Sequence, residues 1–147
     1  MPDGYELVKK VWGYERQIAN FKHEGYCGKI LTVIPGFQCS IHFHAVKHET
    51  FFVVRGSLCV MLYDIPLNMR MAAVTDPTSL DHDKLRQPYP KVLETHEKLT
   101  IEPFQAHKFW CMGGHAGELA EFIEFSTYDN EADSYRITSS GALNHEL

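Results

Sequence analysis

Hydrophobic and polar residues alternate in short runs along most of the chain, a pattern that favours β-strands over helices. The runs are rich in β-branched and aromatic residues, and glycine, proline or charged turns separate them. They predict strands at residues 29–35, 40–45, 49–56, 57–64, 97–103, 107–112 and 120–127. Many short strands at this spacing are typical of a β-sandwich or a small barrel, so we expect an all-β architecture.

Two segments depart from this pattern. The apolar spacing of residues 6–20 suits either a short helix or a pair of edge strands. Residues 78–87 have the only clearly helical pattern, with Thr78 or Ser79 as the N-cap. This predicted helix lies in a polar segment with several prolines, from about residue 66 to residue 90. We interpret that segment as an insertion on the surface of the sheet fold.

Length and composition are those of an ordinary soluble globular protein. The 147 residues are enough for one domain with a substantial core, and we expect a single domain over residues 1–147. The net charge of −5 and the lack of a Lys/Arg run give no reason to expect nucleic acid. The first residues form no apolar leader and no segment has the length of a membrane span, so we expect a cytoplasmic protein without a membrane partner. The four widely spaced cysteines predict buried free thiols in a reducing compartment.

Two histidines and a glutamate gather in one apolar, strand-like segment. Side chains alternate between the faces of a strand, so His42 and His44 point to one side and Phe43 to the other. The four residues after His44 permit a bend that places Glu49 beside the two imidazoles. Two histidines and one carboxylate that converge in this way form a facial set of metal ligands with open positions. The alternative is an exposed strand face with solvated histidines.

A fourth ligand is expected further along the chain, and His107 is the candidate. It lies where two predicted strands meet, after a turn that contains Pro103. By itself such a histidine is more often a structural residue. Beside the first cluster we interpret it as a metal ligand, because these buried polar groups would otherwise all need hydrogen-bond partners in an aromatic core.

The spacing of these residues resembles the first motif of the cupins. That motif is met by Gly36, five residues, His42-x-His44, four residues, Glu49, six residues and Gly56. The second cupin motif has a glycine, five residues, Pro-x-Gly-x-x-His and, four on, an asparagine. Its five positions hold His96, Glu102, Phe104, His107 and Cys111, with a proline one place late at position 103. The sequence thus departs from the second motif at its glycine positions, which form a turn, and keeps the ligand histidine at position 107.

The resemblance implies a double-stranded β-helix, or jelly roll, over about residues 29–127, interrupted by the insertion. It also implies one divalent metal ion inside the barrel, held by His42, His44, Glu49 and His107. Manganese, iron, zinc and nickel all accept nitrogen and oxygen donors, and the sequence leaves the choice among them open. Cupins commonly dimerise through strands near the N-terminus, so a homodimer is implied as well.

Residues 11–15, 26–36 and 118–137 further resemble the sugar-isomerase cupins, which include type II phosphomannose isomerase domains and small D-lyxose isomerases. The features with counterparts there are a Trp-Gly pair at 12–13, the strands that carry Lys29 and Glu124, and a closing Asp-x-x-Arg formed by Asp133 and Arg136. This resemblance implies a sugar or sugar phosphate as the substrate and an aldose–ketose isomerase as the activity.

An aldose–ketose isomerase needs a metal that chelates the carbonyl and hydroxyl oxygens of the sugar, and a base that moves a proton between C1 and C2. Lys47 and Glu124 are the candidates for the base. Lys47 shares a face with Glu49 if the strand extends that far, and the alternative is a solvated loop lysine. Burial on an apolar strand would raise the pKa of Glu124. Glu121 and Glu124 have opposite parity, so one of the two faces water.

Other polar residues receive lesser roles. We expect His48 to face away from Glu49, and His96 to be solvated in a turn. Asp133 and Arg136 are expected to form a surface ion pair, with phosphate binding or the capping of a loop as alternatives.

Two other functions remain open on the sequence alone. The same ligand set with Fe(II) would suit a dioxygenase, for which Arg55, Arg70 or Arg86 would have to bind a substrate carboxylate near the metal. A non-catalytic, metal-containing sugar-binding module would lack any buried proton carrier beyond the metal ligands.

Overall fold

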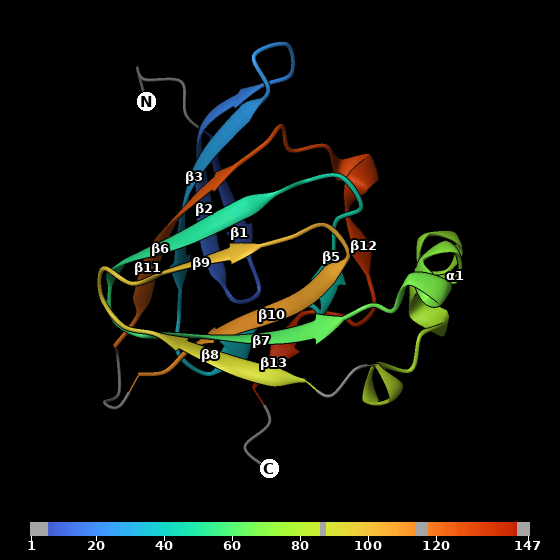
Figure 1. The fold of residues 1–147 in the computed structure, drawn as a ribbon. Coiled ribbons are helices and arrows are strands. Elements are labelled where there is room, and N and C mark those ends of the chain that lie inside the picture. Colours follow the sequence, from blue (N-terminus) through green and yellow to red (C-terminus); the bar gives the residue numbers. More distant parts are fainter. Residues whose placement is uncertain (1–5, 86–87, 114–117, 144–147) are drawn as a thin grey trace.

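Two antiparallel β-sheets face each other and enclose the main core of the protein (Figure 1). The structure is a computed structural model that describes residues 6–85, 88–113 and 118–143. Within these ranges no helix is long and apolar enough to cross a membrane. The architecture confirms the predicted all-β jelly roll with a short helical insertion.

The first sheet has six strands. In spatial order they are β1 (Glu6–Lys10), β2 (Gly13–Phe21), β3 (Tyr26–Val33), β11 (Ala120–Ser126), β6 (Glu49–Arg55) and β9 (Lys98–Ile101). The second sheet is centred on β10 (Gln105–Cys111). Around it lie β12 (Tyr135–Arg136), β5 (His42–Phe43), β4 (Phe37–Gln38), β13 (Gly141–Ala142), β7 (Leu58–Asp64) and β8 (Tyr89–Leu93). Strands far apart in the sequence are therefore neighbours in both sheets.

Each of the seven runs that predicted strands overlaps an observed strand, although β3 and β10 begin before their runs and the other strands are shorter than theirs. Residues 6–20 lie in β1 and β2, so the edge-strand alternative is the correct one. Strand β8 was missed, because Pro90 lies within it and a proline argues against a strand interior. It pairs only with β7, at the edge of the sheet, which is where a proline is tolerated.

The insertion is helical, but its helix lies elsewhere than predicted. It consists of η1 (Leu67–Met69), α1 (Arg70–Thr75), η2 (Pro77–Ser79) and η3 (His82–Lys84). The helix predicted at residues 78–87 is therefore wrong over its described part, and residues 86–87 lie outside the described ranges. The hydroxyls of Thr78 and Ser79 both bond to Asp76 instead of capping a helix, and Leu80 has an extended backbone. Local side-chain bonds of this kind compete with helix formation.

The apolar residues form two clusters on opposite faces of the second sheet. The larger cluster fills the space between the sheets and includes Phe51, Leu62 and Phe109. The smaller one includes Phe43 and Ala73 of helix α1, so the insertion covers the outer face of this sheet. Strand β5 is thus buried on both sides, and its alternation sends Phe43 outward under the insertion and the neighbouring histidines inward.

Both cupin motifs contain residues with left-handed backbone conformations. Gly36 and Gly56 adopt φ values of 88° and 75°, and a Cβ at Gly56 would collide with the carbonyl oxygen of Leu119. In the second motif, His96 and Phe104 stand at the glycine positions and have φ values of 71° and 62°. The left-handed turns are therefore kept without glycine, at a conformational cost that glycine would not incur.

Candidate metal centre and pocket

Three histidines converge inside the barrel. His42 on β5 lies directly opposite His107 on β10 in the antiparallel register, and His44 follows just after β5. The ligand atoms of the three side chains all lie within 4.8 Å of one another. Neutral imidazoles gathered at this distance are able to bind one metal ion together.

The carboxylate of Glu49 faces these histidines from the first sheet. Glu49 begins β6 and is only 2% exposed. Its Oε1 atom lies 3.0 Å from Nε2 of His107, and its Oε2 atom lies 3.9 Å from Nε2 of His44. The fold thus brings together all four residues that the sequence predicts as ligands, from three separate segments of the chain.

Backbone carbonyls hold all three imidazole rings in one tautomer. Nδ1 of His42 lies 2.8 Å from the carbonyl oxygen of Ser40, Nδ1 of His44 lies 2.9 Å from that of Asp133, and Nδ1 of His107 lies 3.0 Å from that of Gln105; these three contacts are alike. Because a carbonyl oxygen only accepts hydrogen bonds, each Nδ1 carries the proton. Each Nε2 then keeps its lone pair, and this is the arrangement that supports metal-ligating histidines.

Unsatisfied polar atoms indicate that a cation belongs among these side chains. Nε2 of His107 and both carboxylate oxygens of Glu49 are buried, and none of them has a hydrogen-bond partner among the described residues. Two acceptor atoms that face each other at 3.0 Å repel unless a cation lies between them. The donor set, three imidazoles and one carboxylate, is one that divalent transition metals accept, so the residues fit a bound metal.

The surroundings also favour the neutral forms of His42 and His44. Burial, followed by the charges of His107 and His44, holds the pKa of His42 well below its ordinary value. Burial likewise lowers the pKa of His44, although the carboxylate of Glu49 acts in the opposite direction. Neutral imidazole is the form that binds metals, so the site does not need to lose protons from these rings at neutral pH.

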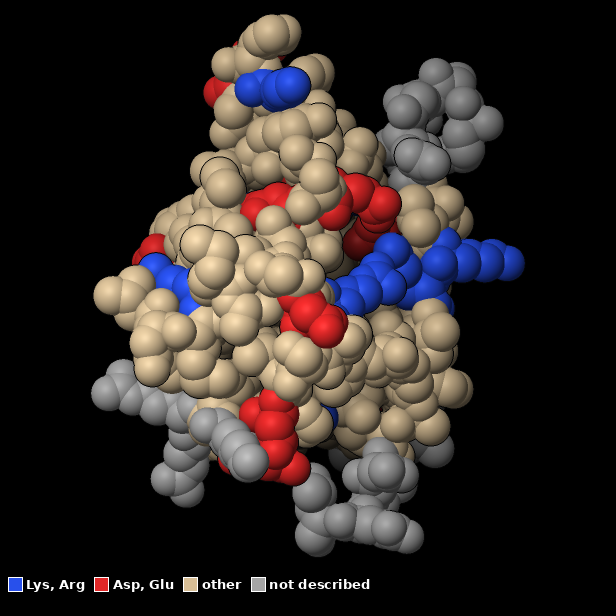
Figure 2. All heavy atoms as spheres, turned by 90° about the vertical axis from the view of Figure 1, so that its right-hand side faces the viewer, with Lys and Arg blue, Asp and Glu red and all other residues tan. Residues whose placement is uncertain are grey.

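A cavity of about 330 Å³ opens onto the histidines, a volume that suits a small molecule. Its lining includes His42, His44, Lys47, Glu124, Asp129 and the aromatic side chains Trp12, Phe51 and Phe109. Figure 2 views the molecule from the side on which β12 lies and shows a hollow bordered by acidic and by basic side chains. The cavity therefore combines metal-binding, charged and aromatic groups in one enclosure.

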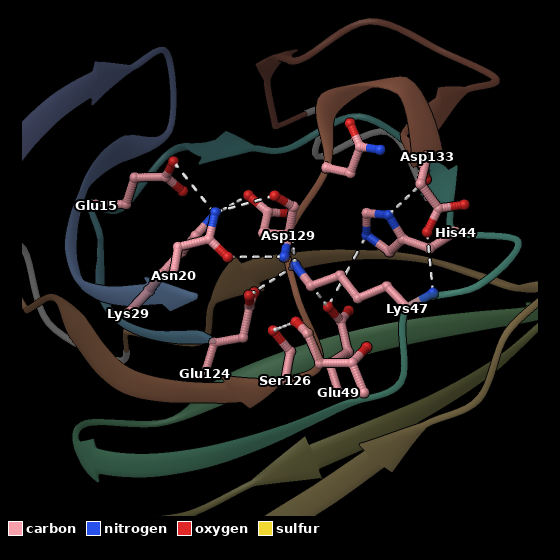
Figure 3. A network of polar contacts seen from close by, with 12 residues as sticks. Glu15, Asn20, Lys29, His44, Lys47, Glu49, Glu124, Ser126, Asp129 and Asp133 are labelled. Carbon is pink, nitrogen blue, oxygen red and sulfur yellow. Dashed lines mark hydrogen bonds and ion pairs between the residues drawn. The ribbon is translucent and has the colours of Figure 1, made fainter. Parts of the chain in front are cut away.

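Lys47 lies at the centre of a buried ion-pair network (Figure 3). Its Nζ atom is 2.8 Å from Oε2 of Glu124, 3.0 Å from Oδ1 of Asp129 and 3.3 Å from Oε2 of Glu49; these carboxylates surround the ammonium group. Burial alone would lower the pKa of Lys47, but the surrounding carboxylates raise it above its ordinary value. Lys47 is thus a buried cation beside the histidines and not a solvated loop lysine.

The orientation of strand β11 shows which of Glu121 and Glu124 faces the cavity, a choice that the sequence left open. Glu124 points into the cavity and is 6% exposed, whereas Glu121 is half-buried on the other face, where it accepts a hydrogen bond from Thr32. Burial and the negative charge of Glu49 raise the pKa of Glu124, although Lys47 opposes this shift. Of these two glutamates, Glu124 is therefore the buried one that lines the cavity.

Two charged residues of this network were given no role in the site by the sequence: Asp129 was not singled out, and Lys29 was noted only as part of the family resemblance. Asp129 lies between two lysines, with Oδ2 2.7 Å from Nζ of Lys29 and Oδ1 3.0 Å from Nζ of Lys47. Lys29 is buried on β3, on the face that also carries Leu31. A charged residue on the core-facing side of a strand was the available signal for Lys29. No comparable pattern marks Asp129, which follows β11 in irregular structure.

The lesser candidates lie outside the cluster. His48 is half exposed and pairs with Glu102 at 3.2 Å, and His96 is exposed beside the ring of Phe52. Neither belongs to the metal-binding group among the described residues.

The expected ion pair between Asp133 and Arg136 is wrong, since no contact between their charged groups occurs in the described part of the chain. The carboxylate of Asp133 instead accepts hydrogen bonds from backbone N–H groups of residues 45–47. The capping alternative is thus the correct one for Asp133.

Of the arginines considered for a dioxygenase, the two that are described lie away from the cavity. Arg55 lines a different pocket, and Arg70 lies 4.6 Å above the ring of Phe104. Arg86 lies outside the described ranges.

Comparison with protein families gives a match over most of the chain. The sequence model of the D-lyxose isomerase family matches residues 10–143. A search among curated proteins gave no match.

Solved structures with a similar fold include the capsular polysaccharide assembling protein CapF from Staphylococcus aureus, with a TM-score of 0.68 at 15% identity over 91% of this chain and 32% of that one. Oxalate decarboxylase from Bacillus subtilis aligns with a TM-score of 0.64 at 13% identity over 91% of this chain and 30% of that one. Oxalate decarboxylase from Lactobacillus farciminis gives 0.63 at 12% identity, over 91% and 34%. The chain spans about a third of the length of these structures. At this level of identity they show the cupin fold alone.

Proposed function

The chain belongs to the D-lyxose isomerase family, and on that premise we propose that it is a metal-dependent aldose–ketose isomerase acting on a free aldose such as D-lyxose. The observation that carries the proposal is that one cavity is lined both by two of the clustered histidines, His42 and His44, and by a buried ion pair, Lys47 and Glu124. A binding module that needed only the metal would have no use for a buried ammonium–carboxylate pair beside it.

The four ligand candidates, His42, His44, Glu49 and His107, would hold the metal. The bound ion would polarise the carbonyl oxygen and the neighbouring hydroxyl oxygen of the sugar, which acidifies the hydrogen on C2. The residues that line the cavity would orient the sugar against the metal and the base.

Glu124 is proposed as the base that acts on carbon. Its carboxylate takes the proton from C2 of the aldose, the carbon electron pair forms the C1–C2 double bond of an enediol, and the same carboxyl group returns the proton to C1. The support for this role is that Glu124 is buried, lines the cavity and lies outside the ligand set. A carboxylate whose pKa is raised by burial and by a neighbouring negative charge is a stronger base than one in water.

Lys47 is proposed as the group that acts on oxygen. Three carboxylates surround its ammonium group, so it is protonated and cannot accept the proton from carbon. It donates a proton to O1 as the carbonyl is reduced to a hydroxyl, and it regains one from O2 as the new carbonyl forms. Protons and electrons balance, since one proton moves from C2 to C1 and one from O2 to O1.

The test is conversion of D-lyxose by the manganese-loaded protein in deuterium oxide. Transfer through a base exchanges the carried proton with solvent, so we expect deuterium on C1 of the ketose. Conversion without any deuterium, together with undiminished turnover of Glu124→Gln, would mean that hydrogen moves directly between the carbons, and Glu124 would lose its role. No conversion of aldopentoses or aldohexoses by protein with stoichiometric metal would refute the activity itself.

Variants assign the roles within a working enzyme. Glu124→Gln should lower kcat at least a hundredfold while Mn²⁺ remains bound, because general base catalysis contributes about 10²–10⁴-fold. Glu121→Gln is the matched control, since Glu121 lies on the same strand and faces away from the cavity. Its kcat should equal that of the unmodified protein.

A further inference from the structure

The segment that connects β11 with β12 forms part of the cavity wall, and it also contacts the loop between β5 and β6. Asp129, Glu131 and Ser134 of this segment line the cavity, together with Arg136 of β12. Asp133, which lies among them in the sequence, points toward His44 and Lys47 (Figure 3). Its polar atoms reach the loop between β5 and β6, which carries Lys47 and separates His44 from Glu49.

The carboxylate of Asp133 binds three successive backbone N–H groups of that loop. Oδ1 accepts from the N–H of Ala45 at 2.8 Å, and Oδ2 accepts from the N–H of Lys47 at 2.9 Å. The N–H of Val46 lies 3.1 Å and 3.2 Å from the two oxygens. Hydrogen bonds to a charged acceptor are stronger than neutral ones, so this single side chain fixes the course of the loop.

The backbone of Asp133 makes a further contact with the site. Its carbonyl oxygen accepts the Nδ1–H of His44 at 2.9 Å, which sets the tautomer and the orientation of that ring. The side chain of the same residue holds the backbone of the loop that leads from His44 to Glu49. Two of the four ligand candidates and the proposed proton donor therefore depend on one residue that is not a ligand candidate and does not line the cavity.

We infer that Asp133 is a positioning residue, which holds the loop of residues 45–47 so that His44 and Glu49 bind a metal tightly and Lys47 reaches the substrate. The part that concerns metal affinity rests on the geometry of the cluster, whereas the part that concerns turnover rests on the proposed isomerase function. Asp129 offers a contrast, because its carboxylate contacts the side chains of Lys29 and Lys47 and not the loop backbone.

The experiment compares Asp133→Asn, Asp129→Asn and Asp83→Asn by titration of the metal-free proteins with Mn²⁺. In Asp133→Asn an amide NH₂ group replaces one carboxylate oxygen and faces backbone N–H donors, while the carbonyl contact to His44 is retained. We expect its Mn²⁺ affinity to fall about 10–100-fold, the range for residues that orient metal ligands. Asp129→Asn should keep its Mn²⁺ affinity and lose turnover only. Asp83→Asn, at an exposed position, should change neither the Mn²⁺ affinity nor the turnover.

An Asp133→Asn protein that folds and binds Mn²⁺ as tightly as the unmodified protein would overturn the inference. Amide hydrogen exchange in the unmodified protein decides the matter if that variant does not fold. The N–H groups of Ala45 and Lys47 lie outside the strands. Slow exchange of these two groups supports their hydrogen bonds to the carboxylate of Asp133, and exchange as fast as in an open loop refutes the inference. The Mn²⁺ and exchange measurements need no substrate, so a failed isomerase assay would leave them interpretable.

Discussion

Nε2 of His107 and Oε1 of Glu49 lie 3.0 Å apart in a fully buried place, and the geometry between them is not that of a hydrogen bond. Nδ1 of His107 already bonds to a carbonyl oxygen, so the two facing atoms are both acceptors. Burying two acceptors face to face costs free energy that a cation between them would recover. A metal ion bound beside this pair would therefore stabilise the fold.

Metal should accordingly stabilise the protein. With metal at a hundred times its Kd, binding adds about 2.7 kcal/mol to the free energy of unfolding. For a chain of this size that corresponds to a rise in Tm of roughly 5–10 °C. Scanning calorimetry with EDTA and then with Mn²⁺ measures the shift.

The same experiment on variants tests the ligand set. His42→Ala, His44→Ala and His107→Ala should each lose stoichiometric metal and the metal-dependent rise in Tm. His48→Ala is the control, because His48 is half exposed and pairs with Glu102 outside the cluster. Full metal retention in the three histidine variants would show that the site has been assigned to the wrong residues.

Removal of Lys47 should destabilise the protein strongly. Lys47→Met leaves the carboxylates of Glu124, Glu49 and Asp129 without their shared cation, and breaking a buried ion pair from one side costs about 3–5 kcal/mol. The double variant Lys47→Met with Glu124→Gln should recover part of the loss, since one buried charge is then removed. Urea denaturation at fixed Mn²⁺ concentration gives these values.

Lys10→Met is the matched control for Lys47. Lys10 is partly exposed, and its Nζ atom lies 3.9 Å from Glu15, so its loss should cost less than about 1 kcal/mol. Equal effects of the two substitutions would mean that the network around Lys47 contributes nothing beyond a surface ion pair.

Asp129 should make stability depend on pH in the acid range. Burial alone would raise its pKa, but Lys47 and Lys29 lower it to about 2, below the ordinary value of 3.8. Since the folded-state pKa is the lower one, the contribution is complete above about pH 4 and is lost as the pH falls toward 2. The side chain is 22% exposed, so screening reduces the contribution to about 1–2 kcal/mol.

Urea denaturation of Asp129→Asn and of the unmodified protein between pH 6 and pH 2 measures this effect. The difference between their free energies of unfolding should shrink by about 1–2 kcal/mol between pH 4 and pH 2. Asp83→Asn, at an exposed position, should show no such change. A difference that stays constant across the whole range would contradict the predicted role of Asp129.

His96 and Phe104 of the second motif both have left-handed backbones, but glycine substitutions at the two positions should change the stability of the protein in opposite directions. His96→Gly should stabilise the protein by about 0.5–1 kcal/mol, because it relieves a φ of 71° and removes only a surface contact with Phe52. Phe104→Gly relieves a similar φ, but it deletes a ring that stacks on Phe43 and lies beneath Arg70. We expect a net loss of about 1–3 kcal/mol, measured by urea denaturation. Destabilisation by His96→Gly would show that its side chain matters more than the backbone strain.

Much of the fold was predictable because strands leave a period-two signature. The run that contains β11 alternates buried and partly exposed residues, and its apolar character predicted a strand without knowledge of its partners. The insertion was harder, because short polar segments are governed by single hydrogen bonds. Bonds from Thr78 and Ser79 to Asp76 replaced the expected helix with isolated turns.

The candidate site divides in the same way. His42 and His44 share a face by local alternation, so the sequence placed them together without tertiary information. The sequence contains no local signal for which of Glu121 and Glu124 faces the cavity. The pairing of β11 with β3 and β6 decided that Glu124 does.

The sequence by itself determined the strand pattern, the cupin motifs and the chemical types of the four ligand candidates. These follow from local rules of side-chain alternation and spacing, which act within a few residues. Only the tertiary structure decided that Lys47 lies among three carboxylates and that Asp133 holds the loop from a distance of 86–89 residues along the chain. Contacts of that kind form when distant strands pair and close the barrel, and a residue type alone does not specify which distant partner it will meet.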